Sequence, residues 1–414
     1  MTSKLFPIQT ATACPLKWSW STLYLNHGTT GSCHRTSYTK LNSDNFFDFH
    51  NTEMKMQDRR DMLEGRWPEN NCLYCRSVED AGGSSDRIRQ LSVPYVVPPE
   101  LENDHHAVNI SPTVLEVYFS NTCNLGCLYC SSSLSSVIAS ENHVHGDFKQ
   151  GGVWLKNKSS HFKDLVPYFW EWFAEKFSTI SRFHVLGGEP LYQKEFEKLL
   201  DMIDQYPNPD CELNIVTNLA ISNERLRNFV AKFKLLLSQR KLKRIDITCS
   251  IDCWGPQQEY VRWPLDLSKW EENFQYLISQ KYLYLNINQT ISALTIKTMP
   301  ALLEKLAEWR KGRKIGHWFS EVDPGPEYLK PTILGGEIFQ EDFVEILSLM
   351  PVDTEENINS YNYMQGIAKH IDLQSPQTKK IQDMITYLNE KDRRRGTDWR
   401  SLFPWLIEVE SHVV

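Results

Sequence analysis

The 414-residue chain has 45 Lys and Arg against 52 Asp and Glu, a formal net charge of -7 at pH 7, and 41% hydrophobic residues. This length allows one large domain with an appendage or two to three smaller domains, and the acidic balance makes nucleic acid an unexpected partner. No apolar run of 18 residues occurs, and the first residues lack the pattern of a secretory signal. We therefore expect a cytoplasmic protein with no membrane partner.

Residues 1–111 show little strand or helix periodicity and carry four cysteines, Cys14, Cys33, Cys72 and Cys75. Four thiolates suffice for one complete site, and ligand count alone does not separate zinc from a [4Fe-4S] cluster. Free thiols are the third alternative. The ten cysteines of this long chain bunch in C-x2-C patterns, which favours metal or iron-sulfur ligation over disulfides. The polar, proline-marked stretch from Val93 to Asn109 reads as a linker.

Three more cysteines, Cys123, Cys127 and Cys130, form a C-x3-C-x2-C array directly after a strand-like run that ends near Ser120. Three thiolates so close on one loop must share an inorganic partner or be unusually reactive neighbours. Three is informative, because a [4Fe-4S] cluster held by three cysteines leaves one iron open for a ligand, whereas structural zinc takes four protein ligands. A zinc loop remains the alternative.

From residue 113, short apolar runs alternate with amphipathic helices, which is typical of a parallel α/β sheet or barrel. The predicted strands are 114–119, 182–186, 212–216, 244–250, 282–289 and 315–321. In such sheets the carboxyl ends of the strands hold the functional site. The cysteine array lies at the end of the first of these strands. Beyond about residue 330 the pattern becomes mostly helical, and this extension is expected to pack against the barrel mouth or side.

Further polar and glycine motifs end the next three strands at the same predicted edge. They are Gly187-Gly188-Glu189-Pro190, Thr217-Asn218, and Ser250-Ile-Asp252 followed by Arg262. Thr217 and Asn218 could meet a ligand's hydroxyls or form a satisfied turn. Three basic clusters, Arg240–Arg244, Arg310–Lys314 and Lys391–Arg395, are expected to be solvated helix ends, since cations suit helix C-termini.

The cysteine array, with Tyr129 before the third cysteine, resembles the signature of the radical S-adenosylmethionine (SAM) superfamily. The resemblance implies a partial (β/α)6 TIM-like barrel, with the six predicted units, and a [4Fe-4S] cluster on Cys123, Cys127 and Cys130 that binds SAM. It also implies that residues 187–190, a GGEP motif, hold the SAM amino group. Ser250, Asp252 and Arg262 resemble the family's S-x-D-G and R-x-P motifs, which would bind the SAM carboxylate or ribose. Cys253 replaces the family glycine.

The segment around Cys72 and Cys75 is similar to the SPASM/twitch segment of radical SAM proteins, which carries an auxiliary cluster. In the best-known members this segment follows the barrel, but here it precedes it. The resemblance implies a second [4Fe-4S] cluster on Cys14, Cys33, Cys72 and Cys75, with zinc as the alternative. The expected domains are 1–111, the cysteine-rich segment and linker; 112–330, the barrel; and 331–414, the helical extension.

By this resemblance the chain is expected to cleave SAM reductively to a 5'-deoxyadenosyl radical, which abstracts hydrogen from a substrate. The SPASM/twitch likeness suggests a peptide or protein side chain as substrate and a flavodoxin or ferredoxin as reductant. A small molecule, such as a carbohydrate, nucleoside or cofactor precursor, is the alternative substrate. A non-catalytic iron-sulfur or zinc protein, serving as redox sensor or scaffold, is the alternative from another class.

Overall fold

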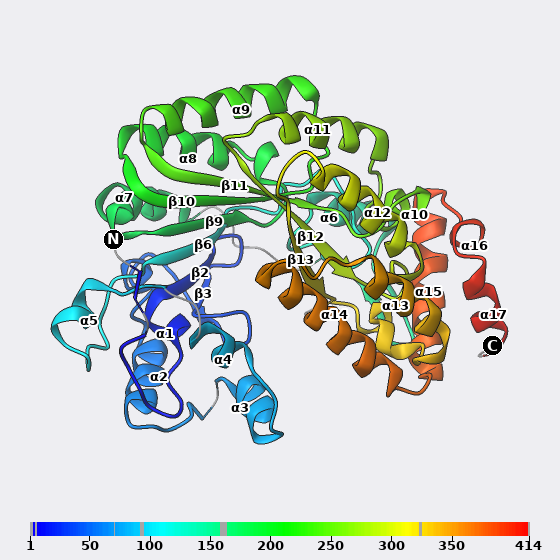
Figure 1. Ribbon diagram of the computed structural model, residues 1–414, viewed down its shortest axis with the longest axis horizontal. Helices are drawn as coiled ribbons and strands as arrows, with labels where there is room; N and C mark the ends of the chain where they lie inside the picture. The colour runs from blue at the N-terminus through cyan, green and yellow to red at the C-terminus, as the bar shows by residue number, and fades with distance from the viewer. Residues whose placement is uncertain are drawn as a thin grey trace. The chain divides into compact units, whose positions relative to one another are not determined.

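The computed structural model describes residues 3–4, 6–69, 71–91, 95–157, 164–322 and 325–412. It shows an α/β fold built on a nine-stranded sheet with the order β13-β12-β11-β10-β9-β6-β2-β3-β4 (Figure 1). The strands are β2 (Trp20–Tyr24), β3 (Thr29–Gly31), β4 (Thr39–Lys40), β6 (Val114–Tyr118), β9 (Arg182–Leu186), β10 (Asn208–Thr217), β11 (Leu242–Ser250), β12 (Tyr284–Ile291) and β13 (Gly316–Glu321). All six predicted strands are present, and from β6 to β13 they lie in chain order, as in a partial (β/α)6 barrel. The predicted fold class is confirmed.

The α-helices are α1 (Pro15–Ser19), α2 (Glu53–Leu63), α3 (Leu73–Asp80), α4 (Asp86–Leu91), α5 (Pro99–Asn103), α6 (Ser136–His145), α7 (Val166–Lys176), α8 (Lys194–Gln205), α9 (Asn223–Ser238), α10 (Pro256–Val261), α11 (Leu267–Ser279), α12 (Met299–Arg310), α13 (Gln340–Leu349), α14 (Glu355–Asp372), α15 (Thr378–Arg395), α16 (Trp399–Leu402) and α17 (Trp405–Ser411). The region after β13 is therefore mostly helical, as predicted. Val93 of the predicted linker and Pro324 near the predicted end of the barrel lie outside the described residues. Among the helices of the described ranges, none is long and apolar enough to cross a membrane.

The chain divides into two compact units. The first unit comprises Met1–Ser120, Ser160–Ile215 and Val230–Ile245, and the second comprises Asn121–Ser159, Val216–Phe229 and Asp246–Val414. In the first unit β6 pairs in parallel with β9, in register from Val114↔Arg182 to Tyr118↔Leu186. On its other side β6 pairs in parallel with β2, and β3 runs antiparallel to β2 as a hairpin that returns to Cys33. The place of β2 in the main sheet was not predicted.

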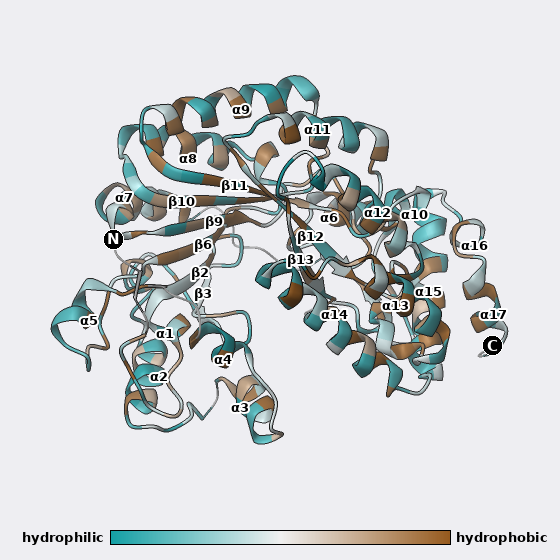
Figure 2. Ribbon diagram, viewed as in Figure 1, coloured by the Kyte–Doolittle hydropathy of each residue, from teal (hydrophilic) through white to brown (hydrophobic). Residues whose placement is uncertain are grey.

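In the second unit β11, β12 and β13 pair in parallel, with Ser250 opposite Asn288 and Asn288 opposite Trp318. Figure 2 shows apolar residues along the central strands and two-sided colouring on helices such as α9 and α11. This pattern is the one expected where strands are covered on both faces and helices on one. The second unit's core joins residues of α12, α13, α14 and α15, among them Leu303, Ile346, Met364 and Leu388.

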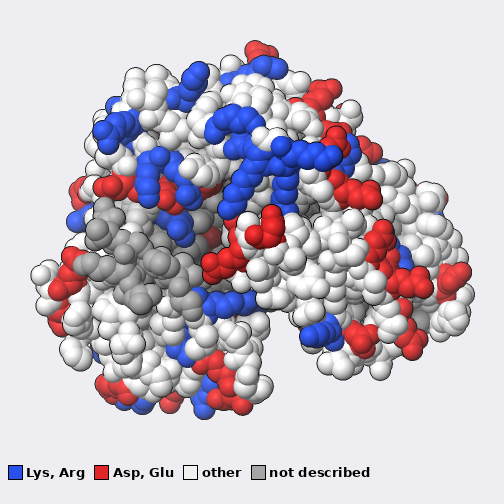
Figure 3. Space-filling model, viewed as in Figure 1, with Lys and Arg blue, Asp and Glu red and all other residues white. Residues whose placement is uncertain are grey.

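All three basic clusters adjoin helix ends, but Lys243 and Arg244 of the first belong to β11, and the third is not solvated as predicted. Lys243 and Arg244 pair with Glu212 at the surface, and Arg313 donates to backbone carbonyls at the end of α11. Figure 3 shows Lys and Arg interspersed with Asp and Glu over much of the visible face. In the third cluster, however, the side chains of Lys391, Arg394 and Arg395 are only 1%, 0% and 2% exposed. The prediction of a solvated helix end is wrong there, because these cations pair with buried carboxylates.

Candidate functional site

The cysteine array lies on a loop that the second unit holds at several points. Gly126 N–H donates to the carbonyl of Trp263 (2.6 Å), and Leu128 N–H donates to that of Val261 (2.9 Å). The Tyr387 hydroxyl donates to the carbonyl of Leu128. These contacts come from segments far apart in the chain and satisfy backbone groups that a free loop would leave to water. The loop conformation is therefore fixed by tertiary contacts rather than by local turn chemistry.

The three thiols of this loop differ in burial: Cys127 is buried, and Cys123 and Cys130 are half-buried. Burial raises the pKa of Cys127, while the guanidinium groups of Arg262 and Arg395 act in the opposite direction. Burial and the neighbouring Cys127 raise the pKa of Cys130 to about 12. As free thiols Cys127 and Cys130 stay protonated at neutral pH, whereas bonding to a metal deprotonates a thiol outright. Arg262 and Arg395 favour the thiolate of Cys127, whereas burial and the Asp252 carboxylate oppose it and leave the pKa raised.

The structure brings Asp252, Arg262 and Tyr129 together behind the cysteine loop. Arg262 binds both carboxylate oxygens of Asp252: Nε donates to Oδ2 and Nη2 donates to Oδ1, each at 2.8 Å. Both side chains are buried. The Tyr129 hydroxyl donates to Asp252 Oδ2 (2.7 Å). The remaining guanidinium nitrogen of Arg262, Nη1, lies 4.0 Å from Cys127 Sγ. Although burial alone lowers it, the Asp252 carboxylate raises the pKa of Arg262 well above its usual value.

This pairing bears on the expected role of Arg262. Two of its donor groups already bind Asp252 in a bidentate fork, which is the strongest geometry available to an arginine. Its remaining nitrogen faces the cysteine loop. The side chain is thus placed to link Asp252 with Cys127. Ser250, the last residue of β11, is largely buried.

At the tip of β10, Asn218 also reaches the cysteine loop. Its Nδ2 donates to Asn124 Oδ1 (2.9 Å) and lies 3.7 Å from Cys123 Sγ, and its Oδ1 accepts from Ala220 N–H (2.9 Å). Thr217, only 1% exposed, accepts from Leu219 N–H through Oγ1 (2.9 Å). Of the two predicted strand-end residues, Asn218 therefore meets a cysteine sulfur, and Thr217 shapes the turn.

The GGEP residues lie in the first unit, directly after β9. Gly187 and Gly188 both have positive φ, +85° and +60°, a conformation that favours glycine. A Cβ on Gly187 would lie 2.3 Å from Cδ1 of Tyr118, so close packing alone already requires glycine there. Glu189 is fully buried and caps η3 (Pro190–Tyr192) by accepting from Leu191 N–H (3.0 Å). Gln193 Nε2 donates to the carbonyl of Gly187 (2.8 Å).

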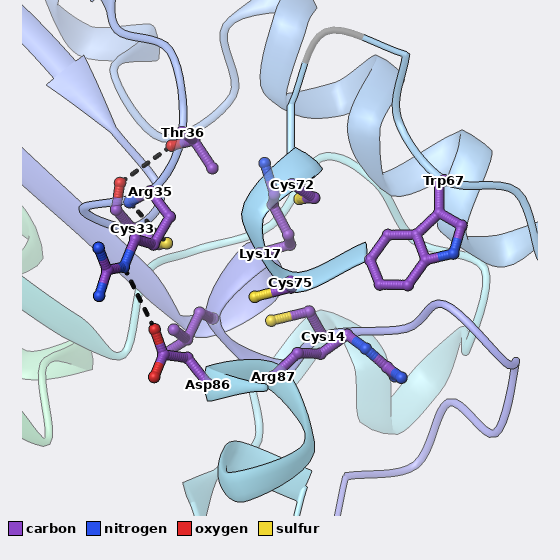
Figure 4. A pocket seen from close by; sticks show the side chains of 11 residues that line it. Cys14, Lys17, Cys33, Arg35, Thr36, Trp67, Cys72, Cys75, Asp86 and Arg87 are labelled. Carbon is purple, nitrogen blue, oxygen red and sulfur yellow. Dashed lines mark hydrogen bonds and ion pairs between the residues drawn. The ribbon is translucent and has the colours of Figure 1, made fainter. Parts of the chain in front are cut away.

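The four N-terminal cysteines line one pocket of the first unit. Cys14 precedes α1, Cys33 follows β3, and Cys72 and Cys75 begin α3. Figure 4 shows their sulfur atoms turned toward the interior of the pocket, with Lys17 beside them. Burial raises the pKa of Cys14 to about 12 and that of Cys72 to about 11.

The charge of Lys17 bears on what this pocket can hold. Burial alone lowers the pKa of Lys17, but the neighbouring Cys72 and Asp58 raise it above its usual value. A buried ammonium group that faces several thiols stabilises their thiolate forms. Lys17 also pairs directly with Asp58, so its charge has one partner independent of the cysteines.

Within the described ranges, no three His, Cys, Asp or Glu side chains converge as the ligands of one metal ion. Zinc bonds thiolates at about 2.3 Å, which brings their sulfurs within about 4 Å of one another. A [4Fe-4S] cluster instead binds each cysteine at a different iron, so its ligands stand farther apart. Thiolates are the usual protein ligands of [4Fe-4S] clusters and also bind zinc, so both cysteine sets have the donor chemistry of either site.

Sequence reasoning missed the contribution of α15 to this site. Tyr387, Lys391 and Arg395 of that helix approach the cysteine loop or its support, and Glu141 of α6 binds both Lys391 and Arg395. The basic run itself was visible, but its burial depends on Glu141, which lies 254 positions before Arg395. Cys211, Cys249 and Cys253 are fully buried, as expected of core cysteines.

Comparison with known proteins gave similarities in structure alone. No family model matches the chain, and no curated protein does. SuiB of Streptococcus suis, bound to S-adenosylmethionine, is 14% identical, with 74% of this chain and 63% of that chain covered and a TM-score of 0.38. The structure of anSMEcpe with bound AdoMet is 16% identical, with 62% of this chain and 62% of that chain covered and a TM-score of 0.38. HemN of Escherichia coli, a coproporphyrinogen III oxidase described as a radical SAM enzyme, is 14% identical. The comparison covers 67% of this chain and 52% of that chain, with a TM-score of 0.32.

The chain spans less than two thirds of the length of each of these proteins. Similarity of this extent assigns neither a family nor an activity to the chain.

Proposed function

We propose that the chain is a radical SAM enzyme whose [4Fe-4S] cluster is held by Cys123, Cys127 and Cys130. The observation that carries the proposal is one loop with three thiols, in which Asn218 reaches Cys123 and Arg262 reaches Cys127. When bound, the cluster and SAM supply reductive cleavage to a 5'-deoxyadenosyl radical that abstracts hydrogen from the substrate. The protein's part is to fix the thiolates, orient SAM and exclude water.

The surrounding residues have separable roles in this proposal. Asp252 holds Arg262 in place, and Arg262 in turn directs its Nη1 toward Cys127. Tyr129, which belongs to the cysteine loop, donates its hydroxyl hydrogen to the same Asp252 carboxylate and so anchors the loop. Residues 187–190, Thr217 and Ser250 are proposed to contact SAM, with glycine at 187 and 188 allowing a close approach to the backbone.

We further propose an auxiliary [4Fe-4S] cluster on Cys14, Cys33, Cys72 and Cys75. Support comes from the shared pocket and from the buried ammonium group of Lys17 beside the thiols. Zinc is the alternative at this site.

The proposed substrate is a peptide or protein side chain, with a small molecule as the alternative, and a flavodoxin or ferredoxin is the proposed reductant in a cytoplasmic setting.

The test uses anaerobically purified, cluster-reconstituted full-length protein. We expect about eight irons per chain, as two [4Fe-4S] clusters require, and 5'-deoxyadenosine formed from SAM with dithionite. Replacing Cys123, Cys127 and Cys130 together with alanine should abolish SAM cleavage and leave about half of the iron. Cys211→Ala, a buried cysteine of β10, is the matched control and should change neither. SAM cleavage that survives the triple replacement would overturn the proposal.

A further inference from the structure

Arg395, the last residue of α15, has a buried guanidinium group that is only partly satisfied. Its side chain is 2% exposed, and its Nε donates to Glu141 Oε2 at 2.7 Å. Its Nη1 and Nη2 are buried and have no hydrogen-bond partner among the described residues. A guanidinium carries five N–H donors, so four of them lack an acceptor. Leaving donors of a charged group unpaired in a dry interior is costly, which points to an acceptor that belongs at this position.

The unpartnered nitrogens lie against the cysteine loop, and both belong to the second unit. A Cβ built on Gly126, the residue before Cys127, would lie 3.0 Å from Arg395 Nη2. The Arg395 Cζ lies 4.9 Å from the centre of the Trp263 ring, and the Trp263 carbonyl accepts from Gly126 N–H. The guanidinium is thus held between the Trp263 ring and the Gly126 backbone, at a point where glycine leaves it room.

The rest of α15 fixes this placement. The carboxylate of Glu141 binds Lys391 through one oxygen and Arg395 through the other, and the Tyr387 hydroxyl binds the carbonyl of Leu128 within the loop. Arg394 binds Glu390 and Asn142. Arg394 and Lys391 therefore have partners of their own, and Arg395 is the member of this buried group whose free donors face the loop.

We propose that Arg395 is a positioning residue that donates hydrogen bonds to the cluster held by Cys123, Cys127 and Cys130 and raises its reduction potential. This inference rests on the proposed function. Hydrogen bonds to the sulfurs and local charge set the potential of an iron-sulfur cluster. Reduction adds one negative charge, which a cation in a low-dielectric setting stabilises. Arg395 therefore makes the cluster easier to reduce, and through it α15 contributes to the function of the site.

The test is a redox titration of the reconstituted full-length protein, followed by electron paramagnetic resonance (EPR), for wild type, Arg395→Met and Arg395→Lys. In the methionine variant we expect the midpoint potential to be more negative by at least 59 mV. For one electron this corresponds to a tenfold change in the equilibrium constant for reduction. The lysine variant keeps the charge and should lose less than half of that shift. Arg393→Met, which removes a 59% exposed cation of the same helix, is the control and should match wild type.

A purely structural role of Arg395 would lower iron content or thermal stability and leave the potential unchanged. A methionine variant with full iron content and the wild-type potential overturns the inference. If that variant takes up too little iron to titrate, Arg395→Leu, which also lacks the charge and the donors, is measured instead, and the wild-type potential there also overturns it. Absence of a cluster in wild type contradicts the proposed function itself, so the two failures are distinguishable.

Discussion

Replacing Asp252 with alanine tests the interpretation that the Asp252–Arg262 pair supports the cysteine loop. The change removes both hydrogen bonds of the Arg262 fork and the acceptor of the Tyr129 hydroxyl, and it also removes the acceptor of Thr290 N–H (2.9 Å). Arg262, whose side chain is 7% exposed, then carries an uncompensated buried charge. Breaking a buried pair in this way costs about 3–5 kcal/mol.

For a cooperative unit of about 150–250 residues, each 1 kcal/mol moves the unfolding midpoint by about 2–4 °C. We therefore expect the midpoint of cofactor-free Asp252→Ala to fall by about 6–20 °C in differential scanning calorimetry. The double variant Asp252→Ala/Arg262→Met removes the stranded charge and should recover part of this loss. A fall of less than about 2 °C, or a double variant less stable than the single one, would refute the reasoning.

Two further predictions concern residues whose structural role can be separated from cofactor binding. Gly187→Ala should destabilise the cofactor-free protein by more than Gly82→Ala. Both glycines have positive φ, +85° and +79°, but only a Cβ at position 187 would meet Tyr118, at 2.3 Å. Equal unfolding midpoints of the two variants would show that Tyr118 does not constrain this position. Burial lowers the pKa of His317 to about 3, while the unfolded value is about 6.5. Between these values the unfolded chain binds more protons, so stability should fall with falling pH, by up to about 1.4 kcal/mol per pH unit. His317→Gln should flatten the denaturant-unfolding profile between pH 6.5 and 4, and an unchanged slope would contradict this assignment.

The sequence predicted the strands after residue 113 because their signal is local: short apolar runs between amphipathic helices. It did not predict that β2 joins the sheet. Ser21 and Thr22 of β2 are fully buried, yet polar residues in a short strand weaken the apolar pattern. Their burial follows from hydrogen bonds to distant partners, such as Ser21 with His50 Nδ1 (2.8 Å) and Thr22 with Glu116 (3.0 Å).

The candidate site was predictable to the extent that it is a motif. The spacing of Cys123, Cys127 and Cys130 named the ligands proposed here, and the spacing of Asp252 and Arg262 marked two residues that the structure brings together. What the motif could not reveal is their pairing with each other, since a family likeness assigns a role to each residue and not its hydrogen bonds. The burial of Arg395 could not be predicted from the sequence either, because it depends on an ion pair with Glu141, which is far away in the chain.

The most direct test of the central claim is the EPR spectrum of the reconstituted Cys72→Ala/Cys75→Ala variant, reduced with dithionite, with and without SAM. This variant leaves the cluster on Cys123, Cys127 and Cys130 as the only one expected. We predict the signal of a reduced [4Fe-4S] cluster whose shape changes when SAM is added, since three cysteines leave one iron open to a ligand. A cluster signal that SAM does not alter, or the absence of any cluster on this loop, would contradict the account.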